Sequence, residues 1–283
     1  MWWKIILIIL GVIIVLIASF ITIGNAIFKR KVNSEVEKLF KERKDAKPKV
    51  VTEEYIKGLP ESVQRYLRHS QIIGKEVIGT VRLKQKGFMR MKEGQKWMPL
   101  EAEEYYTTDP PGFIWHGSIE FVPFLSVKAR DMLFEGKGAM LVKLLGLIGI
   151  ADASGPEMDQ ASLLRYLSET IWFPTAFLSG YIQWEPIDTN SAKATISVDG
   201  LTASAGFYFN ESGELENFIA ERYRDEGGQL ELRTWSTPIT EYKEINGIRM
   251  PSKGDAVWNL SSGDLKYIEV ELTDIEYNNP TKY

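Results

Sequence analysis

The segment AKATISVDG, residues 192–200, decides the fold class of this chain. Its apolar residues occupy alternate positions from Ala192 to Val198, and polar residues stand between them. Strict alternation indicates a β-strand with one buried and one solvent-facing side. The closing pair Asp199-Gly200 suits the positive φ angles of a tight two-residue hairpin turn. The segment therefore predicts an antiparallel strand that continues into a hairpin.

The same alternation recurs in residues 77–86 and 267–272, each with one apolar and one charged face. Turn signals separate the predicted strands. These signals are Glu93-Gly94, residues 210–213, Gly227-Gly228, Asn246-Gly247 and residues 262–264. Short strands joined by such turns predict an antiparallel β-meander that curves into a half-barrel, a barrel or a sandwich.

Two helices accompany the predicted sheet. Residues 60–70 show one apolar and one basic face at helical spacing. Residues 157–172 follow the sequence Ser154-Gly155-Pro156-Glu157, which predicts a capping box at the start of a helix. We therefore expect an α+β fold that is mainly β. In it, residues 51–283 form one curved antiparallel domain capped by these helices.

Residues 1–31 are predicted to be a transmembrane anchor. No charged residue occurs from Ile5 to Phe28, and this run is long enough to cross a hydrocarbon core of about 30 Å. The bilayer is therefore the predicted partner of residues 5–28, in a single pass through the cell membrane. The alternative is a signal peptide cleaved after Ala26, although the apolar run exceeds the roughly 7–15 residues usual for such signals.

Residues 32–50 are predicted to form a stalk helix and linker, because Val32, Val36, Leu39 and Phe40 make a thin apolar row at helical spacing. Lysine and arginine are far denser after the anchor than before it. Under the positive-inside rule, this distribution favours a cytoplasmic domain.

Composition narrows the function classes. The chain has no cysteine, which excludes disulfides, thiolate nucleophiles and a lipidated N-terminal cysteine. Its net charge of −4 argues against a nucleic-acid partner. No phosphate loop, dinucleotide fingerprint or H-E-x-x-H motif occurs, so neither a cofactor nor a metal is predicted. The two histidines, His69 and His116, have no partner nearby in the sequence that would make them a base or a ligand.

Four acidic residues form a candidate polar site. Glu101 and Glu103 share one face of a predicted strand, a spacing that suits an acid/base pair, a hard cation such as Ca²⁺ or simply a solvated sheet face. Asp152 and Glu157 lie near the start of the second helix, where the helix dipole alone stabilises negative charge. A carboxylate-dependent hydrolase would use these residues, but the pattern assigns no catalytic residue.

Large apolar side chains form the candidate ligand-binding site. They are Phe113, Trp115, Phe121, Leu164, Trp172, Phe173, Trp184 and Phe207. A continuous core would use several of them, whereas in a curved sheet capped by a helix they would line a cavity for acyl chains or other hydrophobic molecules. Residues 138–150 are nearly uncharged and predict a buried strand pair or a loop that rests on the membrane.

Several motifs carry a resemblance to a known family. They are Leu59-Pro60 with VQRYL at 63–67, PPGFIW at 110–115, ADASGPE at 151–157, LRYL at 164–167 and WFPT at 172–175. Across about residues 59–277 the chain resembles an uncharacterised, membrane-anchored prokaryotic family known only as a domain of unknown function. Its predicted plan is also similar to the lipoprotein carrier fold of outer-membrane lipoprotein sorting proteins, whose half-barrel cradles acyl chains. That similarity implies an extracytoplasmic domain, and the retained anchor departs from it.

We therefore expect a membrane-tethered binding protein for a lipid or another hydrophobic ligand. The alternatives are a tethered protein-interaction or sensor module with a filled core, and a carboxylate-dependent hydrolase. An apolar cavity would favour the binding protein, and a packed interior would favour the interaction module. Buried carboxyl groups with raised pKa values in a pocket would favour the hydrolase.

Overall fold

The computed structural model describes residues 2–43, 49–122 and 125–283. Four α-helices and two short 3-10 helices are described: α1 (Trp2–Lys41), α2 (Glu53–Ile56), α3 (Glu61–His69), α4 (Pro156–Glu169), η1 (Thr170–Trp172) and η2 (Pro174–Leu178). The first strands are β1 (Thr80–Met89), β2 (Met98–Thr108), β3 (Pro111–Val122), β4 (Leu125–Phe134), β5 (Lys137–Leu144), β6 (Ile148–Ser154) and β7 (Ile182–Asp188). The remaining strands are β8 (Ser191–Val198), β9 (Leu201–Phe209), β10 (Leu215–Asp225), β11 (Leu230–Ser236), β12 (Ile239–Ile245), β13 (Ile248–Leu260) and β14 (Gly263–Tyr277).

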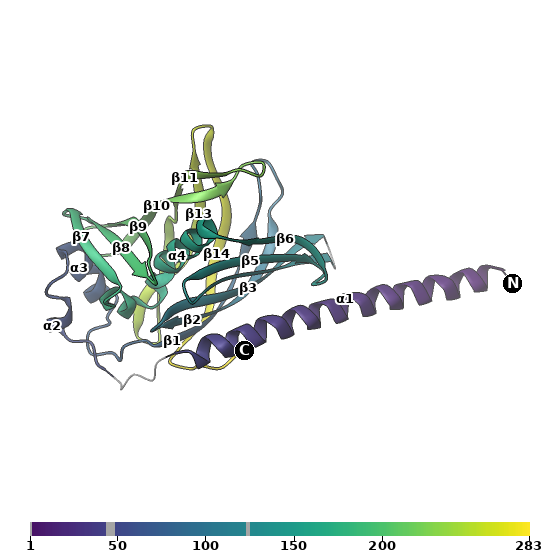
Figure 1. Ribbon diagram of the computed structural model, residues 1–283, viewed down its shortest axis with the longest axis horizontal. Helices are drawn as coiled ribbons and strands as arrows, with labels where there is room; N and C mark the ends of the chain where they lie inside the picture. The colour runs from purple at the N-terminus through teal and green to yellow at the C-terminus, as the bar shows by residue number, and fades with distance from the viewer. Residues whose placement is uncertain (1, 44–48, 123–124) are drawn as a thin grey trace.

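These strands form one antiparallel sheet that curls into a half-barrel (Figure 1), as the alternating segments predicted. The strand order is β6-β5-β4-β3-β2-β1-β14-β13-β11-β10-β9-β8-β7, and β12 pairs with β13. Because β6 and β7 are the two edges of the sheet, the segment that joins them must cross from one edge to the other. That segment contains α4, η1 and η2, and Figure 1 shows α4 inside the curl.

Hairpin turns occur where the Asp-Gly and Asn-Gly pairs predicted them. Asp199 and Gly200 have φ angles of 51° and 81°, and Asn246 and Gly247 have φ angles of 54° and 70°. Positive φ at both central residues is the mark of a type I′ turn, whose twist matches that of the flanking strands. The first pair joins β8 to β9, and the second joins β12 to β13.

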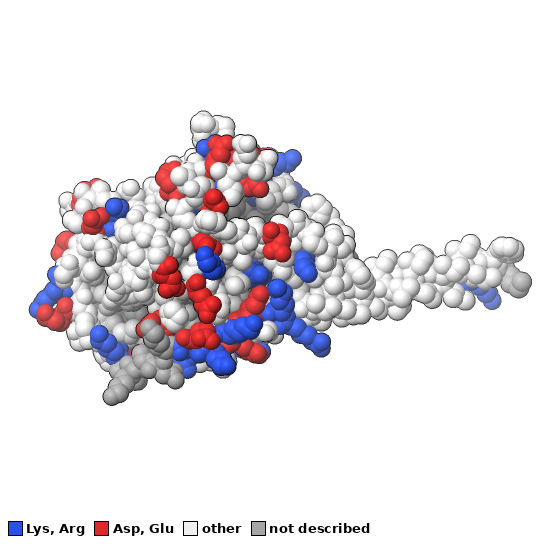
Figure 2. All heavy atoms as spheres, viewed as in Figure 1, with Lys and Arg blue, Asp and Glu red and all other residues white. Residues whose placement is uncertain are grey.

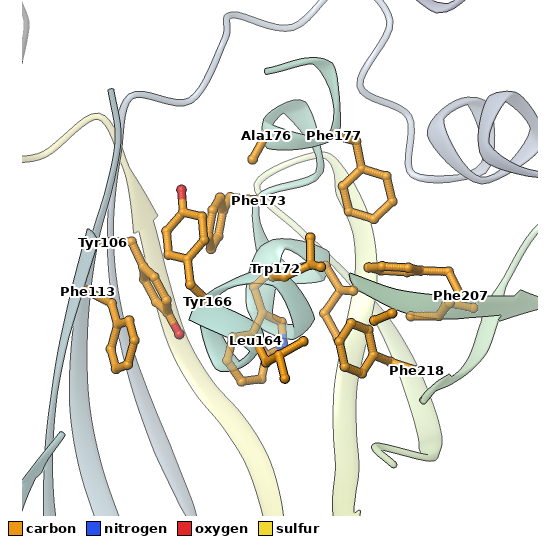
Figure 3. Close-up of a cluster of buried hydrophobic side chains, with 14 of the residues drawn as sticks. Tyr106, Phe113, Leu164, Tyr166, Trp172, Phe173, Ala176, Phe177, Phe207 and Phe218 are labelled. Carbon is orange, nitrogen blue, oxygen red and sulfur yellow. The ribbon is translucent and has the colours of Figure 1, made fainter. Parts of the chain in front are cut away.

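The main core fills the space between α4 and the concave face of the sheet (Figure 3). On one side Tyr106 packs against Phe173, with ring centroids 4.8 Å apart. On the other side Phe207 meets Phe218 edge to face at 5.0 Å. The apolar stripe of α4 is buried between them. Most of the concavity is therefore occupied by the protein's own aromatic side chains.

The start of α4 differs from the predicted capping box. Gly155, at a φ of 119°, precedes the helix in place of Ser154, and no side-chain capping hydrogen bond forms. The carboxylate of Asp159 instead accepts a hydrogen bond from the backbone N–H of Gly138 on β5 at 2.8 Å. Tertiary contact with β5 thus holds this end of the helix, which a local motif could not reveal.

The helix α1 has two halves with different surroundings. Its N-terminal half is exposed and apolar, and by length and composition α1 is the one described helix that could cross a membrane. In its C-terminal half, Phe28, Val32, Val36, Leu39 and Phe40 are buried in a second core against the outer face of the sheet. The region predicted as a stalk is thus packed on the domain as far as Lys41, and residues 44–48 of that predicted region lie outside the described residues.

Candidate functional site

A buried ion cluster centres on Arg165 of α4. Its guanidinium group reaches three carboxylates, each through a different nitrogen. The distances are 2.9 Å from Nε to Glu169, 2.8 Å from Nη1 to Asp131 and 3.0 Å from Nη2 to Glu104. Glu104 lies on β2 and Asp131 on β4, so the cluster ties α4 to two strands of the sheet. The planar guanidinium provides the fixed fork of donors that such multiple pairing requires.

Aromatic rings surround the same guanidinium. It lies 5.1 Å from the ring centroid of Phe113 and 5.0 Å from that of Trp115. The hydroxyl of Tyr106 donates a hydrogen bond to Glu169 at 3.0 Å. Cation–π attraction is strongest where water is excluded, and the Arg165 side chain is only 16% exposed. The cluster is therefore a group of charged side chains enclosed by an apolar interior.

The cluster holds more acidic than basic groups. Burial, together with the nearby Glu169 charge, raises the pKa of Glu104 well above its ordinary value. Burial also raises the pKa of Glu169, although Arg165 opposes that shift. One oxygen each of Glu104 and Asp131 is buried without a hydrogen-bond partner among the described residues. Three carboxyl groups share the single guanidinium, and this imbalance favours the protonated form of Glu104.

A cavity of about 110 Å³ lies next to this cluster. Polar and aromatic side chains of the sheet, α4 and η1 line it, among them Gln85, Trp115, Glu169, Trp172, Arg222 and Trp235. Apolar side chains such as Leu100, Ile171, Ile268 and Val270 complete the wall. The combination of apolar walls with a few polar groups is typical of small-molecule sites, but the volume is below the usual range of about 300–1,000 Å³.

Arg222 supplies an unused donor at the cavity wall. Its guanidinium stacks 4.7 Å from the ring centroid of Trp235. Its Nε is buried, and no described residue provides a hydrogen-bond partner for it. By contrast, the polar side chain of Gln85 is engaged, since it accepts a 3.2 Å hydrogen bond from the indole N–H of Trp115. An acidic or carbonyl group in the cavity would satisfy Arg222.

The predicted ligand-binding residues separate into three groups. Trp115 and Trp172 line the cavity. Phe113, Leu164, Phe173 and Phe207 are buried in the core, and the half-buried Trp184 packs 5.0 Å from Phe207. Phe121 points outward at the end of β3 and is 60% exposed. Only two of the eight predicted residues thus border the space that the structure leaves open.

The predicted acidic residues lie apart from the ion cluster. Glu101 and Glu103 share the outer face of β2, where Glu101 borders a separate hollow of about 550 Å³ and Glu103 pairs with Lys29 of α1 at 3.7 Å. Asp152 is exposed on the edge strand β6, and Glu157 lies in the first turn of α4.

Sequence reasoning missed Glu104, whose side chain faces inward because neighbours along a strand face opposite sides. Two signals were available. The strand alternation places Glu104 with Leu100 and Ala102, and Arg165 and Glu169 are spaced four residues apart on α4.

Both histidines have partners from distant parts of the chain. His116 lies under α1, with its ring centroid 5.6 Å from that of Phe28, and burial lowers its pKa to about 4. His69 accepts a 2.8 Å hydrogen bond from Nε of Arg249, and burial and this charge lower its pKa. Within the described ranges no three His, Asp or Glu residues are placed to hold a metal ion.

The comparison with family models decides the family. A model described as a family of unknown function, DUF6544, matches residues 49–270. The chain belongs to the DUF6544 family. The matched DUF6544 region contains all the residues of the ion cluster and almost the whole sheet. No curated protein matches the chain.

Two solved structures are similar to this DUF6544 protein in architecture. A domain from Vibrio parahaemolyticus, assigned to outer membrane lipoprotein sorting, has 9% identity and a TM-score of 0.43 over 72% of this chain and 87% of its own. A LolA superfamily protein from Nitrosomonas europaea has 8% identity and a TM-score of 0.36 over 81% of this chain and 95% of its own. Both structures come from the lipoprotein-sorting class of proteins whose fold the predicted plan resembles.

Proposed function

We propose that the protein is a membrane-tethered binding protein for a hydrophobic ligand that carries an acidic or carbonyl group. The observation that carries the proposal is the cavity beside α4. It combines three tryptophans with the Nε of Arg222, which has no hydrogen-bond partner in the described part of the chain. Apolar walls would hold the hydrophobic part of the ligand, and Arg222 would bind its polar group. The apolar helix α1 would anchor the protein in the bilayer.

The cavity volume limits the ligand. A cavity of about 150 Å³ is known to accept a benzene-sized molecule, and the volume here is about 110 Å³. The site therefore accepts a short apolar group or one end of a chain in its present shape. A longer acyl chain would require η1 or the neighbouring strands to move outward.

Binding fits the site better than hydrolysis. Glu169 is the acidic residue of the ion cluster that borders the cavity, but both of its oxygens already accept hydrogen bonds, from Arg165 and Tyr106. A carboxylate that activates water needs a free oxygen directed at that water. The cluster instead forms one wall of the cavity, through Arg165 and Glu169.

Native mass spectrometry of the full-length protein in detergent, with added lipid extract, tests the proposal. We expect a reproducible bound mass on the wild-type protein. Ala256→Leu adds bulk at a cavity-lining position and should abolish that mass. Arg222→Met should weaken its binding at least tenfold.

Arg224→Met is the matched control. Arg224 lies two residues further along β10 and pairs with Glu226, and it does not border the cavity. This variant should bind like the wild type. A wild-type protein that takes up no lipid or fatty acid would overturn the proposal.

The second candidate is a tethered interaction module with a filled core. It is favoured by the complete burial of Phe113, Phe173 and Phe207, three of the residues predicted as a cavity wall. If the protein is such an interaction module, Ala256→Leu should change its stability and leave its other properties as they are in the wild type.

A further inference from the structure

We propose that the end of β3 at Val122, the start of β4 at Leu125 and the β5–β6 hairpin turn enter the headgroup region of the bilayer that α1 crosses. These hairpin ends would hold the domain against an anionic membrane surface. The proposal rests on α1 being the membrane anchor proposed above. It adds a second attachment, through the rim of the half-barrel.

Exposed apolar side chains gather at these hairpin ends. Phe121 and Val122 end β3, Leu125 begins β4, and Ile148 and Ile150 lie on β6. All five are exposed, from 37% for Leu125 to 60% for Phe121. Soluble proteins rarely group large exposed apolar residues, so such a group indicates a contact surface. The predicted strand pair of residues 138–150 does form, but its second strand is not buried.

The two hairpin ends lie together and beside α1. The backbone N–H of Leu145, in the β5–β6 turn, donates a hydrogen bond to the carbonyl of Ser126 on β4 at 3.0 Å. The same turn packs on Gly24 of α1, where an added Cβ would lie only 2.3 Å from the Leu145 carbonyl oxygen. Glycine at this position permits the close approach of turn and helix.

The level of Gly24 along α1 fixes the depth of the hairpin ends. About 20 helical residues span a hydrocarbon core of about 30 Å. If Lys4 stays at the far interface, the span runs from Ile5 to Gly24. The turn at Leu145 then meets the near boundary of the hydrocarbon. In Figure 2, the end of the domain from which α1 projects is largely free of charged residues.

Lysines lie on the outer face of the sheet, next to the hairpin ends on the side away from the hydrocarbon. Lys128 and Lys143 stand directly opposite each other on β4 and β5, and Lys29 of α1 lies on the same face. Lys128 donates a hydrogen bond to Ser118 at 2.8 Å, and Lys29 pairs with Glu103 at 3.7 Å. Like charges directly opposite in a sheet are unfavourable. Anionic headgroups at this level would offset that repulsion.

Single-cysteine labelling of the full-length protein tests the proposal, because the chain has no native cysteine. Ile148→Cys is labelled with an environment-sensitive fluorophore, and the protein is placed in nanodiscs that contain spin-labelled lipids. Ile187→Cys is the matched control, since both isoleucines are 52% exposed and both lie on edge strands. Ile13→Cys, in the middle of the anchor, reports on the anchor alone.

We expect strong quenching at positions 13 and 148 and none at position 187. Quenching at position 13 with equal signals at 148 and 187 would overturn the rim contact and leave the anchor intact. Absence of quenching at position 13 would overturn both the membrane anchor and the rim contact.

The lipid charge provides a separate test. Replacing part of the phosphatidylcholine by anionic phosphatidylglycerol should at least double the quenching at position 148, and Lys143→Gln should reduce this increase. Lys193→Gln is the control, because Lys193 pairs with Glu185 beside the distant edge strand β7. Equal quenching at position 148 with and without phosphatidylglycerol would overturn the role assigned to the lysines.

Discussion

The guanidinium of Arg165 on α4 lies 3.0 Å from the carboxyl group of Glu104 on β2, and the Glu104 side chain has no solvent exposure. The helix crosses the concave face of the sheet, so this pair joins the two layers of the fold. A buried ion pair stabilises only weakly against an apolar replacement of both partners, whereas the loss of one partner leaves an uncompensated group. The stability of the domain should therefore respond very unequally to changes at the two residues.

Arg165→Met should destabilise the protein by about 3–5 kcal/mol, because it leaves three buried carboxyl groups without their cation. Chemical unfolding of the full-length protein in detergent, followed by circular dichroism, measures the change. Arg68→Met is the control: Arg68 pairs with Glu53 at the surface, and loss of an exposed pair costs about 0–1 kcal/mol. Equal effects of the two variants would contradict the structural role of the cluster.

Glu104→Gln should be tolerated, because burial and the nearby Glu169 charge favour the neutral form of Glu104. The raised pKa means that the folded state binds this proton where the unfolded state has lost it. This proton therefore adds to stability at a pH below the pKa that Glu104 has in the unfolded protein. The added stability is lost as the pH rises toward the pKa that Glu104 has in the folded protein. The variant should lack this part of the pH dependence. A large loss of stability at pH 7 would show that the carboxylate is charged in the native state.

His116 should make the protein acid-sensitive. Its pKa is lowered to about 4 by burial beneath α1, so in the folded state it stays neutral while the unfolded state takes up a proton. Stability is thus lost as the pH falls from about 6.5 toward 4, by up to about 3 kcal/mol over the whole window. Unfolding curves of the wild type and of His116→Phe at several pH values measure the difference. Parallel pH profiles would refute this assignment.

Gly24→Ala should disturb the contact between α1 and the β5–β6 turn, since the new Cβ would meet the Leu145 carbonyl oxygen. Overpacking of this kind costs about 1–3 kcal/mol. Gly11→Ala is the matched control in the same helix, because nothing lies within 4 Å of an added Cβ there. Limited proteolysis in detergent should cut the β5–β6 hairpin faster in the first variant only. Equal cleavage rates would mean that helix and hairpin are not in contact.

The strands and turns that were predicted correctly are those whose sequence pattern lies within a few neighbouring residues. The alternation in residues 192–199 and the Asp-Gly turn are local, and both appear as β8 and its hairpin. The face of β2 was also assigned correctly for Glu101 and Glu103. The importance of Glu104 was missed, because its role depends on Asp131 and Arg165, which are far away in the sequence.

By itself the sequence determined the curved antiparallel sheet, the domain helices α3 and α4 and an apolar N-terminal helix. Strand alternation, turn residues and apolar runs act over a few neighbouring positions. Only the tertiary structure decided which aromatic rings fill the core and which border the cavity. It also decided where Arg165 finds its carboxylates and that α1 packs on the outer face. Burial and charge pairing depend on residues that are distant along the chain, and no local pattern specifies which of them meet.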